Sequence, residues 1–383
     1  SDRVRLRQLT VDVLMIAVAL SGFIASPITA GELDYGLLPE SYRYRYSLGA
    51  QFEQWTDDRT GPLGEPLQQT SFYAYAAQYL SYQLHLEVLG VLTKTYWGAA
   101  GSVSQLTRDT KVRMSYRYRP PLVFHLGFNI PTGYSPIDQE NLVLANGVSN
   151  RLKGYRVSKF GEGFDVDVGV AWAHQPGVWT LGYGLDFLHK GNYQMVIDQP
   201  DYEPGAQFVI SMAADRRWGP AGSQSPATYK QLRLVALMTV YEADEQAGDE
   251  VLEFGPRLRV AVQFTQIWPS CEWSVRGRYL RSSESDFREA TALPTSSAEG
   301  IGDELYLDTA LRFDCGRRSR LVGALEGRAL AQEDRGATSG HRLTVGAGAG
   351  HYRGGLWWNL MGWFGAGLQT GGVIGDDTQL DVN

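Results

Sequence analysis

Apolar and polar residues alternate along much of the chain, and the stretch SYRYRYSLGAQFEQW at residues 41–55 is the clearest example. Its apolar positions begin with Tyr42 and Tyr44, and Arg43 and Arg45 alternate with them. A period of two is that of an extended strand, because successive side chains point to opposite faces. The stretch therefore predicts a β-strand with one apolar face and one strongly polar face.

The same alternation recurs in paired segments that are joined by turn residues. One pair is separated by Pro120 and Pro121, which mark a turn because proline is excluded from the interior of a sheet. A second hairpin spans residues 164–187 and turns at 174–177, and a final strand is expected within 367–382. The other expected strands are 41–55, 70–80, 82–95, 111–119, 122–130, 205–216, 229–241, 255–267, 271–281, 304–314, 320–331, 341–350 and 355–366.

The connections between these strands alternate between long and short. The longer set includes 55–69, 131–163, 191–204, 282–303 and 332–340, and the shorter set includes 120–121, 174–177, 268–270, 315–319 and 351–354. Only the connection at 218–228 is long where a short one is expected. Segregation of long loops to one end is typical of transmembrane barrels and has no reason to occur in a soluble sandwich. The pattern predicts an all-β fold, a transmembrane antiparallel β-barrel of 14–16 strands.

Tryptophans support this prediction. Trp172 and Trp179 flank one short turn, and Trp268 and Trp273 flank another. Amphipathic rings at one level of a barrel form an interfacial girdle. The alternative is tryptophan in the core of a soluble β-protein.

The N-terminus has the three parts of a secretory signal peptide. Three arginines form a basic region, residues 11–24 are mostly apolar, and the sequence SPITA ends in a cleavage site after Ala30. The alternative, a membrane anchor or a buried helix, is disfavoured because the apolar run is short for a bilayer span. We therefore expect a signal peptide at 1–30 and a β-barrel with long extracellular loops at 31–383.

Composition adds two constraints. The chain has 383 residues with a formal net charge of −7, which argues against a nucleic-acid partner. Its 21 tyrosines, 10 tryptophans and 44 glycines are typical of a barrel with aromatic belts and tight turns.

Two stretches add a local resemblance. HLGFNIPTGY at 125–134, followed by GEGFDVDVGVAWAH at 161–174, resembles the strand, PTG loop and strand of outer-membrane transporters associated with aromatic-compound degradation. More generally, the chain resembles porin-like bacterial outer-membrane channels. The resemblance implies a location in the outer membrane of a diderm bacterium, with membrane lipid and small or ionic solutes as partners.

The sequence offers no motif for catalysis or for a cofactor. None of the six histidines lies in a serine–histidine motif of known spacing, so we expect no enzyme, although an outer-membrane hydrolase is an alternative. No cysteine or histidine spacing predicts a metal site, and the glycine-rich stretches do not precede a helix, so no cofactor is predicted.

Charged residues on the polar faces of the expected strands are the candidate lining of a water-filled pore. They are Arg43, Arg45, Lys111, Arg113, Arg117, Arg119, His125, Asp165, Asp167, Asp186, Arg257, Arg259, Arg276 and Arg278. Charged walls bias ion traffic, and the arginines predict a preference for anions. Ordinary solvated charge is the alternative.

Two further expectations concern Cys271, Cys315 and residues 131–163. Both cysteines are expected at the short-turn end of neighbouring strands, which predicts a cross-strand disulfide in an oxidising compartment. Two free thiols whose register is off by one pair are the alternative. The long connection at 131–163 is expected either to fold into the pore or to form an external flap.

Taken together, these features predict an outer-membrane channel or passive transporter for small solutes. A barrel that serves as a subunit or scaffold of an envelope complex is the alternative. The sequence leaves the solute and the oligomeric state open.

Overall fold

The computed structural model describes fifteen segments of the chain. They are residues 19–20, 44–57, 66–81, 83–97, 102–119, 121–133, 163–194, 196–219, 228–283, 285–287, 302–316, 318–332, 339–353, 356–370 and 379–382. Within these segments no helix is long and apolar enough to cross a membrane. Arg43 and residues 134–162 lie outside them, so the expected roles of that arginine and of the long connection stay predictions.

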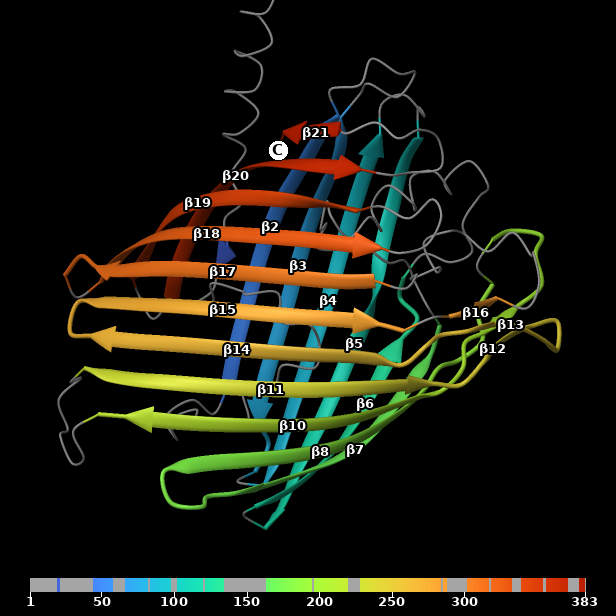
Figure 1. Ribbon diagram of the computed structural model, residues 1–383, viewed down its shortest axis with the longest axis horizontal. Coiled ribbons are helices and arrows are strands. Elements are labelled where there is room, and N and C mark those ends of the chain that lie inside the picture. The colour runs from blue at the N-terminus through green and yellow to red at the C-terminus, as the bar shows by residue number, and fades with distance from the viewer. Residues whose placement is uncertain are drawn as a thin grey trace, which may run out of the picture.

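Fifteen long strands form one continuous antiparallel ladder (Figure 1). They are β2 (Tyr44–Asp57), β3 (Leu67–Tyr79), β4 (Leu84–Trp97), β5 (Ser102–Arg119), β6 (Leu122–Ile130), β7 (Asp165–His174), β8 (Trp179–His189), β10 (Gln207–Trp218), β11 (Tyr229–Tyr241), β14 (Arg257–Trp268), β15 (Cys271–Ser282), β17 (Gly302–Asp314), β18 (Ser319–Gln332), β19 (Ser339–Arg353) and β20 (Leu356–Thr370). Each overlaps an expected strand, so the predicted all-β antiparallel fold is confirmed. The largest difference is β5, which begins at Ser102 instead of residue 111.

Two short strands return the ladder to its start. β1 (Ala19–Leu20) and β21 (Gln379–Val382) each pair with both β2 and β20, and all four pairings are antiparallel. In a ladder of fifteen antiparallel strands the first and the last run in the same direction, so one further antiparallel strand is needed between them. β21 takes that place at one end of the strands, within the range where the sequence predicts a sixteenth strand. β1 takes it nearer the other end.

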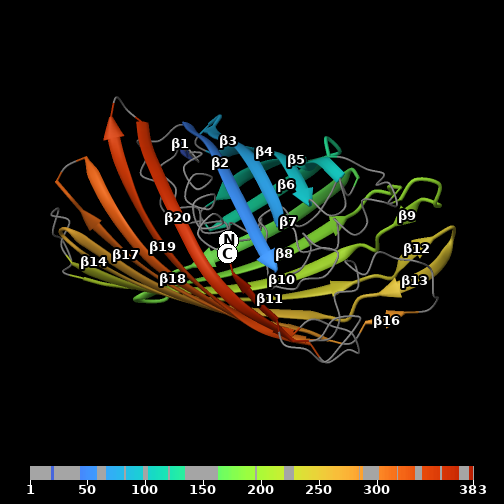
Figure 2. The same cartoon turned by 90° about the horizontal axis from the view of Figure 1, so that it is seen from above.

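The sheet curves so that β2 to β8 face β10 to β20 across its interior (Figures 1 and 2). Its two faces have opposite chemistry. We call the face that carries Gln69, Ser71 and Thr95 the inner face, because all three side chains are fully buried. The face that carries Leu92 and Phe364 is the outer face, and these two residues are 63% and 64% exposed.

The distribution is the reverse of that in a soluble protein, where large apolar side chains are buried. Inner polar groups bond to each other across strands: Gln69 Nε2 donates to Thr95 Oγ1 at 3.3 Å, and Thr93 Oγ1 donates to Ser71 Oγ at 3.2 Å. Exposed leucine, valine, isoleucine and phenylalanine side chains lie along the outer face from β2 round to β20.

The strand ends that the long connections of the expected pattern join lie at one end of the ladder (Figure 1). There, four short strands form a second antiparallel sheet: β9 (Tyr202–Glu203), β12 (Asp244–Gln246), β13 (Asp249–Glu253) and β16 (Asp286–Phe287). Its buried centre is Tyr202, Val251 and Leu252. The sequence predicts loops here, so this small sheet is an addition to the prediction.

The disulfide prediction is wrong for this structure, because Cys271 and Cys315 are both free. The register of β15 with β17 places Cys271 directly opposite Phe313, and Cys315 lies two residues further on, beyond the end of β17. Cys315 is therefore displaced by two residues from the position opposite Cys271. This is the alternative of two free thiols with a shifted register.

Candidate functional site

The inner face brings most of the predicted pore-lining residues together. One row of directly opposed residues joins His85, Ser115, His125, Gly169 and Asp186 across β4 to β8. The predicted residues that the register places on this face are Lys111, Arg113, Arg117, His125, Asp165, Asp167, Asp186, Arg257, Arg259, Arg276 and Arg278. Arg45 lies in β2 opposite Ala77, and Arg119 follows a register shift in β5.

Acids on neighbouring strands face several of these arginines. Arg276 Nη2 lies 3.0 Å from Asp308 Oδ2, and Arg278 Nη2 lies 3.6 Å from Glu304 Oε1. The guanidinium groups of both arginines also lie over the ring of Tyr306, at 5.6 and 4.9 Å from its centroid. Opposite charges directly across a sheet stabilise it and also reduce the field that either one projects.

Paired acidic and basic side chains continue into β18 and β19, beyond the residues predicted from the sequence. Glu326 pairs with Arg342, and Arg328 Nε lies 3.8 Å from Glu304 Oε1. A run of mixed charge therefore crosses β15, β17, β18 and β19. Period-two alternation places these residues on the inner face, but it does not tell which residues of adjacent strands lie opposite each other.

Asp165 belongs to a different environment from that predicted. It is 6% exposed, and its Oδ2 accepts a hydrogen bond of 3.2 Å from Asn129 Nδ2. The same amide donates to Asp109 Oδ2 at 3.1 Å, and Asp109 Oδ1 accepts from the backbone N–H of Gly133 at 2.8 Å. This buried network fixes the start of the long connection after β6. We therefore assign Asp165 an anchoring contact and leave it out of the proposed lining.

Aromatic side chains gather on the outer face at the short-turn end. The rings of Trp172 and Tyr183 stack at 5.6 Å between centroids, and Arg216 lies over the rings of both Trp179 and Trp218. Such a band of amphipathic rings, with an arginine among them, suits a boundary between apolar and aqueous surroundings. The position next to the short turns agrees with the tryptophan pattern in the sequence.

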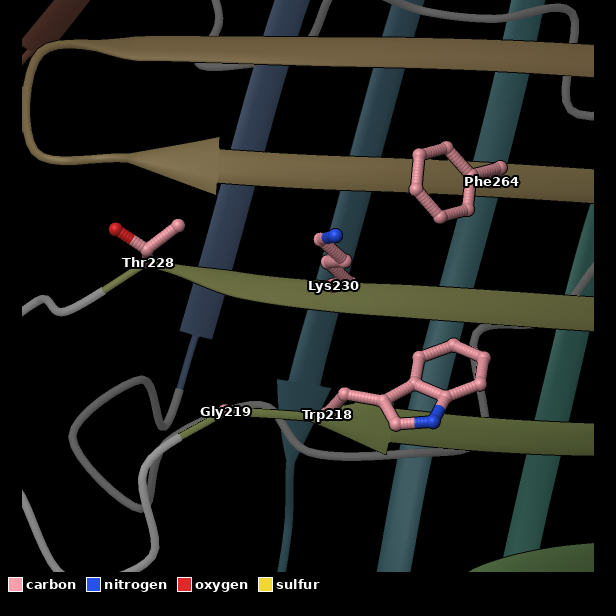
Figure 3. A pocket seen from close by; sticks show the side chains of 5 residues that line it. All are labelled: Trp218, Gly219, Thr228, Lys230 and Phe264. Carbon is pink, nitrogen blue, oxygen red and sulfur yellow. The ribbon is translucent and has the colours of Figure 1, made fainter.

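A hollow of about 510 Å³ lies beside the same band (Figure 3). Its lining includes Trp218, Lys230 and Phe264, which the register places on the outer face, and Gly219 and Thr228 at the adjoining ends of β10 and β11. Because this hollow opens outward, it is separate from the charged inner face.

One serine and one histidine lie within hydrogen-bond distance of each other, although no local sequence motif joins them. Ser319 Oγ lies 3.0 Å from His351 Nδ1 near the short-turn end, where Ser319 is half-buried and His351 is exposed. A hydrolase needs a third group that orients the histidine. In the part of the chain that the structure describes, His351 makes no ion pair with a carboxylate. The contact is therefore only a cross-strand hydrogen bond in its present surroundings.

Comparison with known proteins gives likenesses of low identity. No protein-family model matches the chain, and no curated protein matches it. Among solved structures, a BenF-like porin from Pseudomonas fluorescens Pf-5 is 10% identical and has a TM-score of 0.44, with 91% of this chain and 98% of the porin covered. The COG4313 outer membrane channel from Pseudomonas putida F1 is 13% identical over 66% of this chain and 92% of the channel, with a TM-score of 0.39. At these values the likenesses carry no argument about function, and the fold rests on the strand pairing itself.

Proposed function

We propose that the chain is an outer-membrane β-barrel of a diderm bacterium that lets small solutes cross passively through its polar interior. Membrane lipid would surround the outer face, and small or ionic solutes would contact the inner face. The general porin-like resemblance in the sequence agrees with this proposal.

The observation that carries the proposal is the inverted distribution of apolar and polar side chains. Soluble monomers rarely expose a continuous apolar surface larger than a few hundred Å². Here exposed large apolar residues occupy the outer face around the whole ladder, from Leu48 on β2 to Phe364 on β20. Hydrocarbon is the solvent that favours such a surface, and a sheet whose strands return on themselves leaves few backbone groups unpaired in it.

Strand length agrees with a membrane span. A transmembrane strand needs about 9–11 residues when it is tilted by about 45°. The long strands range from 9 residues in β6 to 18 in β5. The aromatic band at the short-turn end would then lie at one membrane surface, and the small sheet of β9, β12, β13 and β16 would stand in water beyond the other.

A preference for anions belongs to the same proposal, and we expect it to be modest. The arginines on β14 and β15 supply positive charge to the inner face. Arg276 and Arg278 nevertheless lie close to Asp308 and Glu304, and paired charges cancel each other's field at a distance. Arg113 likewise lies 3.9 Å from Asp167.

Conductance of the purified full chain in planar lipid bilayers tests the proposal. We expect stable single-channel steps, with a reversal potential in a KCl gradient that is displaced slightly toward the chloride potential. A folded barrel that inserts and conducts no ions would contradict the proposal and support the role of a scaffold in an envelope complex. Release of fatty acid from the same bilayers, lost in Ser319→Ala, would instead support a hydrolase.

A further inference from the structure

The strands β6, β7 and β8 bring one histidine and two aspartates together on the inner face. His125 Nε2 lies 2.6 Å from Asp186 Oδ1 and 3.6 Å from Asp167 Oδ1. One donor atom from each of the three residues lies within 4.8 Å of the other two. No local sequence motif predicts this cluster, because only the strand register brings the three residues together.

The histidine is buried and points into the cluster. Its side chain is only 2% exposed, and neither ring nitrogen makes a hydrogen bond of acceptable geometry in the structure. Nε2 nevertheless lies within 2.6 Å of Asp186 Oδ1, a close approach that lacks the alignment of a well-directed hydrogen bond. A buried imidazole whose nitrogens lack hydrogen-bond partners is costly unless another group binds it.

Glycine makes room for the cluster. Gly169 lies between His125 and Asp186 in the row of opposed residues. A Cβ atom at position 169 would lie 2.2 Å from His125 Cε1 and 2.3 Å from Asp186 Oδ1. The imidazole and the carboxylate therefore meet above the glycine, in space that any other residue would fill.

The charges around the cluster orient one carboxylate. Arg113 Nη2 lies 3.9 Å from Asp167 Oδ2, while the other oxygen of Asp167 faces His125. The side chains of Asp167 and Asp186 are 31% and 24% exposed, so an ion in the interior can reach their oxygens. With a neutral imidazole, the two carboxylates carry two negative charges that a single arginine does not balance.

We propose that His125, Asp167 and Asp186 form a binding site for a divalent transition-metal ion of the zinc class. Zinc binds histidine nitrogen and aspartate oxygen at about 2.0–2.2 Å, which places tetrahedral donor atoms about 3.4 Å apart. The 3.6 Å between His125 Nε2 and Asp167 Oδ1 suits this geometry, whereas Asp186 Oδ1, at 2.6 Å from Nε2, would have to move outward to about 3.4 Å when the ion binds. An imidazole ligand favours zinc over magnesium or calcium, which prefer oxygen donors alone. The fourth coordination position would face the interior.

Binding of Zn²⁺ to the folded full chain in detergent, after treatment with a chelator, tests the site without any measurement of conductance. We expect saturable binding of one ion per chain, and substitution of Co²⁺ should give visible absorption bands typical of tetrahedral coordination. His125→Gln, Asp167→Asn and Asp186→Asn should each weaken binding at least about 10-fold. His85→Gln, which removes another inner-face histidine outside the cluster, is the matched control and should keep wild-type affinity.

Gly169→Ala is an independent variant, because it keeps all three ligands and fills the space between them. We expect it to lose the ion as well. If that variant fails to fold, the ligand variants still decide the question. If a protonated His125 instead joins the two aspartates without a metal, the wild type should not bind Zn²⁺ saturably, and the ligand variants should not differ from it in Zn²⁺ binding. Absence of saturable Zn²⁺ binding in the wild type, or equal affinity in His125→Gln and the wild type, would overturn the proposal.

Discussion

A charge on the outer face provides the sharpest test of what surrounds the barrel. Leu307 lies near the middle of β17, is 55% exposed and faces outward. Leu307→Arg would place a guanidinium near the middle of the membrane, at a cost of about 2–4 kcal/mol in a transmembrane barrel. Since 1.4 kcal/mol corresponds to a factor of ten, the ratio of folded to unfolded protein should fall about 30- to 700-fold.

Position along the strand adds a second measurement. Phe313 faces outward six residues further along β17, which is about 20 Å along the strand and about 15 Å along the membrane normal at a tilt of about 40°. That distance reaches the membrane surface, where Phe313→Arg should cost only about 0–1 kcal/mol. Ala310→Arg, on the inner face of the same strand, is the matched control, and we expect its charge to be tolerated because it meets water.

Denaturant titration of the three variants in lipid vesicles, followed by tryptophan fluorescence, measures these free energies. Arginine on the water-exposed surface of a soluble protein usually changes stability by less than about 0.5 kcal/mol at any such position. Equal stability of Leu307→Arg and Phe313→Arg, or folding of the wild type without lipid or detergent, would therefore refute the assignment of the outer face to lipid.

Substitutions at three other places test separate features. Asp308→Asn removes the negative charge beside Arg276 and should move the reversal potential in a KCl gradient toward that of chloride, whereas Arg276→Gln should move it the other way; shifts of the same sign would exclude this pair from the ion path. In a chain that lacks Cys315, Phe313→Cys should form a disulfide with Cys271 under mild oxidation, because the two positions lie directly opposite each other. The wild type should give two alkylatable thiols, and a cross-link between them would disprove the register. Ala247→Asn should slow proteolysis of the β12–β13 hairpin about 2- to 5-fold, because this turn residue has a φ of 56°, which asparagine tolerates better than alanine; unchanged cleavage would show that the turn does not limit opening.

The long strands are predictable because each is a half-exposed surface with a strict period of two. In β7, for example, Val166 and Val168 alternate with Asp165 and Asp167, and this pattern fixes both the strand and its faces. The small sheet of β9, β12, β13 and β16 cannot be predicted from such a pattern. Its core residue Tyr202 lies in a strand of two residues, and the other two come from a strand of five, so no period develops.

The charged contacts are less predictable than the strands that carry them. Sequence alternation places Arg276 and Asp308 on inner faces, but only the register shows that they lie opposite each other. The same reason explains the failure of the disulfide prediction, where a difference of two residues separates Cys271 from its expected partner. It also explains why the cluster around His125 has no signal in the sequence.

The junction between β2 and β20 has a mechanical consequence for the whole barrel. β20 is joined to β19 by fifteen residue pairs but to β21 by four and to β1 by two. If the signal peptide is cleaved after Ala30, β1 leaves with it, and β21 alone would close this side among the described strands. Local opening occurs where the fewest hydrogen bonds must break, so amide hydrogens of β2 and β20 should exchange with solvent before those of β10 or β11. The sheet should thus separate first along the junction between β2 and β20.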